Sequence, residues 1–82
     1  MSVGTMVRQF IAGSFYVPDP AALDDGASLL DQGIIDSTGV LVLTRFLEDS
    51  FGVTVEDAEM IPENLDSVAR IVAFVGRKQA PG

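Results

Sequence analysis

Three segments of this chain carry apolar residues at intervals of three and four, the spacing of one face of an α-helix. The first segment contains Val3, Met6, Val7, Phe10 and Ile11, and the others lie within residues 37–51 and 66–78. Val53-Thr54-Val55 is β-prone but too short for a stable strand. Three amphipathic helices in 82 residues predict a single all-α domain in which each long helix contributes one apolar face.

Helix breakers and capping residues predict where the helices begin and end. Gly13, followed by Pro18 and Pro20, ends the first helix, and Gly52 ends the second. Pro62 is expected to stop a short helical turn, and Asn64 or Asp66 to cap the last helix. These signals place one domain at residues 1–82, with helices at about 2–14, 37–51, 56–60 and 66–78 and a long loop at 15–36.

The apolar stripes also predict which residues form the core. In the second helix the buried stripe is Val40, Leu43, Thr44, Leu47 and Phe51. In the last helix it is Val68, Ile71, Val72 and Val75, with Phe74 at the flank. The long loop is expected to be pinned to the core by Leu23, Leu29, Leu30, Ile34 and Ile35. Leu41 and Val42 fall off the stripe; we expect Leu41 to rest against the short helix and Val42 to be exposed.

Composition argues against several classes of function. A net charge of −7 with five basic residues argues against nucleic-acid binding, which needs clustered Lys and Arg. The absence of Cys and His removes disulfides, thiolate nucleophiles, imidazole-based triads and the usual zinc sites. Residues 1–8 lack the pattern of a secretory signal, and no apolar stretch approaches a bilayer span, so a cytoplasmic protein without a membrane span is expected.

Asp36 and Ser37 lie at the predicted start of the second helix. Both residue types can cap a helix, and this is the ordinary interpretation of such a pair. The free amides of a helix's first turn and the positive end of its dipole also favour an attached anion, including a phosphate ester. Ser37 is therefore also a candidate for modification.

A longer pattern adds to this local signal. Leu-Leu-Asp-Gln-Gly-Ile-Ile-Asp-Ser at residues 29–37, followed by Phe-Leu-Glu-Asp-Ser-Phe-Gly-Val at 46–53, closely resembles the acyl carrier protein family, which includes peptidyl and D-alanyl carriers. The resemblance covers about residues 29–75. It implies a right-handed bundle of three main helices plus one short helix, in which the long first loop joins two helices that point the same way. It further implies that Ser37 carries 4'-phosphopantetheine, with Asp36 and Thr38 beside it.

The resemblance implies a carrier rather than an enzyme. A phosphopantetheinyl transferase with Mg²⁺ would move phosphopantetheine from coenzyme A to Ser37, whose local motif contains no base. The terminal thiol would then hold an acyl or aminoacyl group as a thioester, loaded by a ligase and passed to transferases or synthases of fatty acid or polyketide biosynthesis. A monomer is expected. The residues expected to dock partner enzymes are Leu41, Val42, Arg45, Glu48 and Ile61. Ile61 and Leu65 could lie near the cofactor arm or in the core; the core is favoured for Leu65.

The second helix departs from the fatty-acid carriers. Those proteins typically have Leu, an acid and, one turn later, another acid where this chain has Thr38, Gly39 and Val42, and Arg45 adds a positive charge. A specialised or secondary-metabolic pathway is therefore favoured over housekeeping fatty acid synthesis. An aminoacyl, D-alanyl or peptidyl carrier loaded by an adenylating ligase is the main alternative. An unmodified helical interaction module and an acidic metal sensor are more distant, since the acids at residues 56–59 lack calcium-loop spacing. Gly39 is expected to help the loop and arm move.

Overall fold

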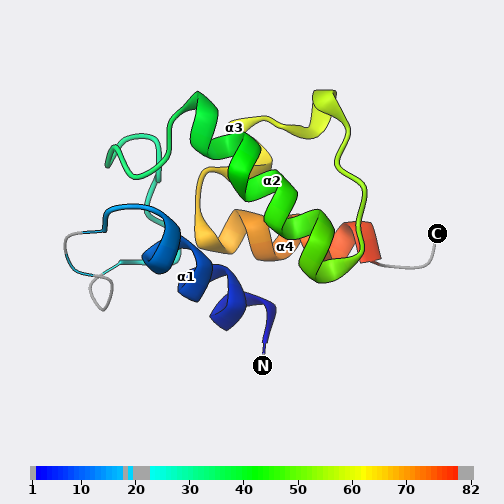
Figure 1. The fold of residues 1–82 in the computed structure, drawn as a ribbon, viewed down its shortest axis with the longest axis horizontal. Helices are drawn as coiled ribbons and strands as arrows, with labels where there is room; N and C mark the ends of the chain where they lie inside the picture. Colours follow the sequence, from blue (N-terminus) through cyan, green and yellow to red (C-terminus); the bar gives the residue numbers. More distant parts are fainter. Residues whose placement is uncertain (1, 18, 20–22, 80–82) are drawn as a thin grey trace.

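The computed structural model describes residues 2–17, 19 and 23–79, and in this part of the chain every regular element is helical (Figure 1). The all-α class predicted from the apolar spacing is thus confirmed. Pro18 and Pro20, expected to end the first helix, lie outside the described residues. The elements are α1 (Val3–Ser14), α2 (Ser37–Phe51), the 3₁₀ turn η2 (Asp57–Glu59), α3 (Pro62–Leu65) and α4 (Val68–Gln79).

The two N-terminal long helices begin at capping residues. At the start of α1, Ser2 Oγ accepts a hydrogen bond from the Thr5 amide at 3.1 Å. At the start of α2, the Asp36 side chain accepts a hydrogen bond from the Gly39 amide. Gly52 follows α2 in the left-handed conformation, with φ +68°, and its amide donates to the Glu48 carbonyl at 3.0 Å. A glycine at this position ends a helix without the steric cost that a side chain would carry.

The segment between α2 and α4 differs from the prediction. The short helix expected at 56–60 is only the three-residue turn η2, and Pro62 begins α3 instead of stopping a helix. Proline suits the first position of a helix because its fixed φ is helical and its missing amide hydrogen would have no partner there. Two short elements, η2 and α3, therefore lie between α2 and α4, where one short helix was expected.

The predicted caps of the last helix, Asn64 and Asp66, were wrong. Ser67 precedes α4; its carbonyl accepts from the Ile71 amide at 2.9 Å, and its hydroxyl accepts from the Arg70 amide at 3.1 Å. Asn64 lies within α3, and Asp66 ends it, with its amide donating to the Pro62 carbonyl. The helix expected from residue 66 accordingly begins at Val68.

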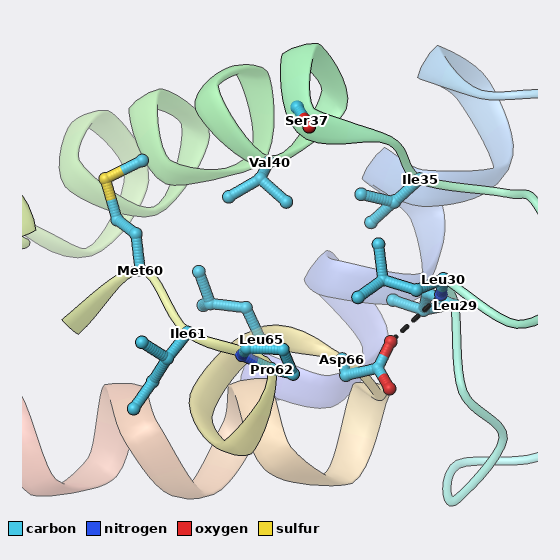
Figure 2. Close-up of a pocket in the computed structure, with 10 residues that line it drawn as sticks. All are labelled: Leu29, Leu30, Ile35, Ser37, Val40, Met60, Ile61, Pro62, Leu65 and Asp66. Carbon is cyan, nitrogen blue, oxygen red and sulfur yellow. Dashed lines mark hydrogen bonds between the residues drawn. The ribbon is translucent and has the colours of Figure 1, made fainter. Parts of the chain in front are cut away.

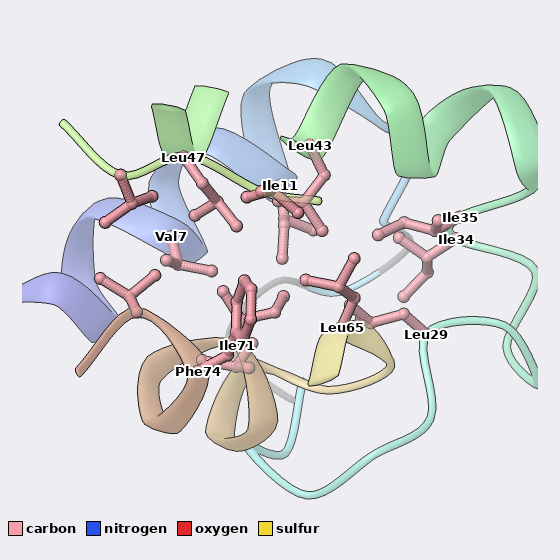
Figure 3. Packing of buried hydrophobic residues seen from close by; sticks show 14 of the residues in the cluster. Val7, Ile11, Leu29, Ile34, Ile35, Leu43, Leu47, Leu65, Ile71 and Phe74 are labelled. Atoms are coloured by element: carbon pink, nitrogen blue, oxygen red, sulfur yellow. The ribbon is translucent and has the colours of Figure 1, made fainter. Parts of the chain in front are cut away.

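The core lies between α1, α2 and α4 and extends under the first loop (Figure 3). Its fully buried residues include Val7 and Ile11 from α1, Leu43 and Leu47 from α2, and Ile71 from α4. The predicted burial of four loop residues is confirmed: Leu23, Leu29, Ile34 and Ile35.

Several burial predictions need correction. In the predicted stripe of α2, Val40 and Phe51 are only half-buried. Phe74 is buried at 2% exposure rather than lying at the flank, while Val72 is only half-buried. Because α4 packs against α1, α2 and α3, its buried face is wider than one stripe. Leu30 is exposed, and so is Leu41. Leu41 lies beside Phe10 of α1, not against the short elements that follow α2.

Aromatic rings join α1 to α2. Phe10 stacks on Phe46 with ring centroids 4.1 Å apart and planes 9° from parallel. Phe15 meets Phe10 edge-on, and Phe51 meets Phe46 in the same way. Such contacts add to the free energy gained by burying the rings.

The first loop is held by α1 and by the start of α4. The Arg8 guanidinium donates to the Leu23 carbonyl at 2.6 Å and pairs with the Asp25 carboxylate. The Asp25 carbonyl accepts from the Ala69 amide at 2.9 Å. These bonds attach residues 23–25 of the first loop to α1 and α4. None of the helices in the described residues combines the length and apolar character needed to cross a bilayer.

Candidate functional site

Ser37 is the first residue of α2, and its side chain is exposed. The capping role belongs to its neighbour: Asp36 Oδ1 accepts from the Gly39 amide at 2.7 Å, and the Asp36 carbonyl accepts from the Val40 amide at 2.9 Å. Sequence left open whether Asp36 or Ser37 is the cap. Because Asp36 is the cap, the hydroxyl of Ser37 is not needed to satisfy the helix end.

The surroundings of Ser37 favour a negative group. The backbone amides in the first turn of α2 point toward the N-terminal end of the helix, where Ser37 lies. Among the described residues, the amides of Ser37 and Thr38 donate no hydrogen bond. The positive end of the helix dipole adds to this preference. The Asp36 carboxylate opposes it, although one of its oxygens is occupied by the Gly39 amide.

A cavity of about 310 Å³ opens beside Ser37, between α2 and the α3 segment (Figure 2). Val40 from α2 and Leu65 from α3 point into it from opposite sides, and Ser37 lies at its rim. Most of the lining is apolar, which suits a hydrocarbon-like group. The lining residues are Leu29, Leu30, Ile35, Ser37, Val40, Met60, Ile61, Pro62, Leu65 and Asp66.

Asp66 is the acidic residue of this lining, and it holds two walls together. Its carboxylate accepts from the Leu30 amide at 2.9 Å, the bond drawn in Figure 2, and from the Ser28 hydroxyl at 2.6 Å. The Asp66 carbonyl accepts from the Leu29 amide at 2.7 Å. Asp66 thus attaches the first loop to the end of α3 along one side of the cavity.

The predicted site residues occupy different surfaces. Leu41, Val42 and Arg45 are exposed on the outer face of α2, in a shallow groove shared with α1. Ile61 is 38% exposed and lies on the cavity wall across from α2. Thr38 is exposed but does not line the cavity.

Glu48, expected to dock partners, is half-buried, and its carboxylate accepts from the Val55 amide at 3.0 Å. This bond ties α2 to the segment that follows it. The side chain therefore has a structural contact that the sequence did not indicate.

Gly39 is packed closely against its neighbours. A side-chain carbon added at this position would lie 2.9 Å from Phe15 Cε1, 3.3 Å from Asp36 Oδ1 and 3.4 Å from Ile35 Cγ2. The first turn of α2 can approach Phe15 only because residue 39 has no side chain.

Sequence reasoning did not identify most of the cavity. Val40 and Leu65 were assigned to the core, and Leu65, at 3% exposure, belongs to both core and cavity wall. Leu30, Met60 and Pro62 received no site role. Apolar periodicity could have indicated the wall residues of α2, but no local pattern reveals a gap between two elements.

The remaining site chemistry is limited. Among the described residues, no three acidic side chains come together in a way that could hold a metal ion. Comparison with protein-family models gave no match, and comparison with curated proteins gave no significant match. The functional conclusion therefore depends on Ser37 and the cavity beside it.

Proposed function

We propose that this chain is a carrier of the acyl carrier protein type, in which 4'-phosphopantetheine is attached to Ser37 and holds an acyl or aminoacyl group. The observation that carries the proposal is an exposed serine hydroxyl at the first position of α2, relieved of capping by Asp36 and placed at the rim of an apolar cavity.

The residues around Ser37 suit this group. When bound, phosphopantetheine supplies a terminal thiol, which a chain without cysteine lacks. The first-turn amides of α2 would face its phosphodiester, and the cavity lined by Val40, Ile61 and Leu65 would shelter an apolar arm or cargo.

Attachment forms a bond from Ser37 Oγ to the phosphorus that bears the pantetheine arm of coenzyme A and breaks the pyrophosphate bond, releasing adenosine 3',5'-bisphosphate. The Ser37 proton needs a base, and the chain has no histidine. The base and the Mg²⁺ would therefore come from a phosphopantetheinyl transferase.

The three long helices and the short α3 would form the right-handed bundle of such carriers. We place the carrier in a specialised pathway, because α2 has no acid between Ser37 and Arg45 for the basic docking surfaces of fatty-acid synthesis. The proposal further takes the protein to be a cytoplasmic monomer that an acyl- or aminoacyl-activating ligase loads. Aminoacyl or peptidyl cargo uses the same attachment and is distinguished only by the ligase.

Intact-mass spectrometry tests the proposal. The chain is incubated with coenzyme A, Mg²⁺ and a promiscuous phosphopantetheinyl transferase. A mass gain of roughly 340 Da is expected, as for esterification of one hydroxyl. Ser37→Ala should abolish the gain, while Ser50→Ala, which removes an exposed serine near the other end of α2, should retain it. An unmodified wild-type chain would refute the carrier function and favour an interaction module.

A further inference from the structure

Among the described residues, Asp66 is the one charged residue that lines the cavity beside Ser37. The rest of the lining is apolar apart from Ser37 itself. Figure 2 shows the Asp66 carboxylate next to Leu30, whose amide it accepts. In a mostly apolar pocket, the few polar groups decide which molecules are accepted and how they are oriented. Asp66 is therefore the group that determines which charge a molecule in this cavity can carry.

The positive charges of the chain are all directed to groups other than Asp66. The sequence has five Lys and Arg residues, and each of them is described by the structure. Their partners give the pairs Arg8–Asp25, Arg45–Asp49, Lys78–Glu59, Arg70 with the Glu63 carbonyl, and Arg77 with Asn64. The two donors to the Asp66 carboxylate, the Ser28 hydroxyl and the Leu30 amide, are neutral. A positive charge opposite Asp66 has to come from a molecule other than this part of the chain.

The attachment of the first loop to α3 does not require the charge of Asp66. An asparagine at this position could accept from the Leu30 amide through Oδ1 and donate from Nδ2 to the Ser28 hydroxyl, which can also accept. It would avoid the free-energy cost of holding a charge on a half-buried side chain. The two hydrogen bonds thus require a polar side chain here, but not a charged one.

The charge of Asp66 affects a cargo that enters the cavity, because the cargo displaces water from the carboxylate. A hydrocarbon would remove this water and offer no new partner, which is costly for a charged group. A carboxylate on the cargo would add repulsion between like charges. An ammonium would instead supply the missing positive charge in a charge-assisted hydrogen bond, while its methylene groups contact apolar wall residues such as Val40, Ile61 and Leu65.

We propose that Asp66 selects the cargo of this carrier, and that the cargo is an acyl group with an amino group at the end away from the thioester. This inference rests on the proposed function and deepens it by naming the chemistry of the cargo. Methylene groups that end in an ammonium match an apolar cavity with a single carboxylate. Asp66 contacts the cargo and takes no part in attachment at Ser37.

The test uses three coenzyme A thioesters of matched length: 7-aminoheptanoyl, octanoyl and suberoyl, which end in an ammonium, a methyl group and a carboxylate. The promiscuous transferase moves each acyl-phosphopantetheine to Ser37, and intact-mass spectrometry confirms loading. Hydroxylamine then cleaves the thioester, forming a hydroxamate and releasing the thiol, and a cargo held in the cavity slows this cleavage. Dividing by the cleavage rate of the same coenzyme A thioester in solution corrects for the intrinsic reactivity of each cargo.

In the wild type, the 7-aminoheptanoyl thioester should be protected about threefold or more over the octanoyl thioester, and the suberoyl thioester should be protected least. Asp66→Asn should lower the protection of the 7-aminoheptanoyl thioester by about the same factor and raise that of the suberoyl thioester. Asp31→Asn removes an exposed carboxylate of the same loop that does not line the cavity, so it should leave the order of the three unchanged. Urea denaturation checks that both variants are folded.

Several outcomes would overturn this assignment of the cargo. Better protection of the octanoyl than of the 7-aminoheptanoyl thioester in the wild type would assign the cavity to a plain hydrocarbon. An unchanged order in Asp66→Asn would show that its charge does not select the cargo. If Asp66→Asn does not fold, the wild-type order decides, together with its expected loss at high salt. In each case loading of the wild type keeps the carrier function intact, whereas a wild-type chain that is not loaded would overturn both proposals.

Discussion

Asp66, at the end of α3, accepts a hydrogen bond from the hydroxyl of Ser28, which lies 38 residues earlier, at an oxygen–oxygen distance of 2.6 Å. The same carboxylate accepts from the Leu30 amide at 2.9 Å. One side chain thus holds the first loop against α3 beside the cavity.

Asp66→Ala should lower the free energy of unfolding by about 1–3 kcal/mol, because the partly buried Ser28 hydroxyl and the Leu30 amide both lose their partner. Ser28→Ala should cost about 0.5–1.5 kcal/mol, since it removes the partly buried bond to Asp66 and an exposed bond from the Asp31 amide at 3.1 Å but leaves the Leu30 bond in place. Urea denaturation followed by circular dichroism measures both. Asp31→Ala, at an exposed carboxylate of the same loop, is the control and should change stability by less than about 0.5 kcal/mol. An equal loss in Asp31→Ala and Asp66→Ala would contradict the assigned role.

Asp36 and Ser37 should separate into a structural and a functional residue. Asp36→Ala removes the cap of α2 and should lower the free energy of unfolding by about 0.5–2 kcal/mol, whereas Asp36→Asn should restore most of it. Ser37→Ala should change stability by less than about 0.5 kcal/mol, because its hydroxyl is exposed. Thermal unfolding of the three variants checks this. A larger loss in Ser37→Ala than in Asp36→Ala would mean that Ser37 is the cap.

Two helical glycines should respond oppositely to alanine. Gly76→Ala in α4 adds a methyl group that meets nothing within 4 Å apart from its chain neighbours and the backbone of its own helix, so it should raise stability by up to about 1 kcal/mol through helix propensity. At Gly39 the same methyl group would lie 2.9 Å from Phe15 Cε1, and overpacking of about 1–3 kcal/mol should outweigh that gain. Combining Gly39→Ala with Phe15→Leu should recover part of the loss in a double-mutant cycle. Additive losses in this cycle would place the strain elsewhere.

The long helices were predictable because the burial pattern of α1 and α2 repeats with the period of a helix. Ser2 marks the start of α1 and Gly52 marks the end of α2, and both ends depend only on hydrogen bonds to residues nearby in the sequence. The exposure of Ser37 could also have been predicted, because it depends on the neighbouring residue, Asp36, being the N-cap of α2.

The region from Pro62 to Ser67 was not predictable in the same way. Asn64, Asp66 and Ser67 are all residue types that can cap a helix, and local sequence does not rank them. Asp66 is bonded instead to Ser28 and Leu30, far away along the chain, which leaves Ser67 to accept from the Arg70 amide. The cavity was not predictable for a similar reason, because its size depends on the distance between α2 and α3, which are separated in the sequence by residues 52–61.

The segment that bears Met60 and Ile61 is fastened to α4 by an ion pair. Glu59 Oε1 accepts from Lys78 Nζ at 2.8 Å and from the Glu56 amide at 2.9 Å. The hydrogen bond from Lys78, followed by that from the Glu56 amide, holds the pKa of Glu59 below its ordinary value of 4.5. Glu59 therefore favours the folded state when it is ionised.

This pairing predicts a pH-dependent difference between the wild type and Lys78→Met. Because the folded-state pKa of Glu59 is the lower one, its contribution is fully present above the unfolded value of 4.5 and is lost as pH falls through the folded value. The stability advantage of the wild type over Lys78→Met should thus be constant near neutral pH and shrink below about pH 4.5. Urea denaturation across an acidic pH series measures it, with Arg70→Met, at an exposed cation distant from Glu59 in sequence, as the control that keeps a constant difference. An advantage that grows as the solution is acidified would contradict the pairing, because protonation of Glu59 removes the charge that Lys78 stabilises.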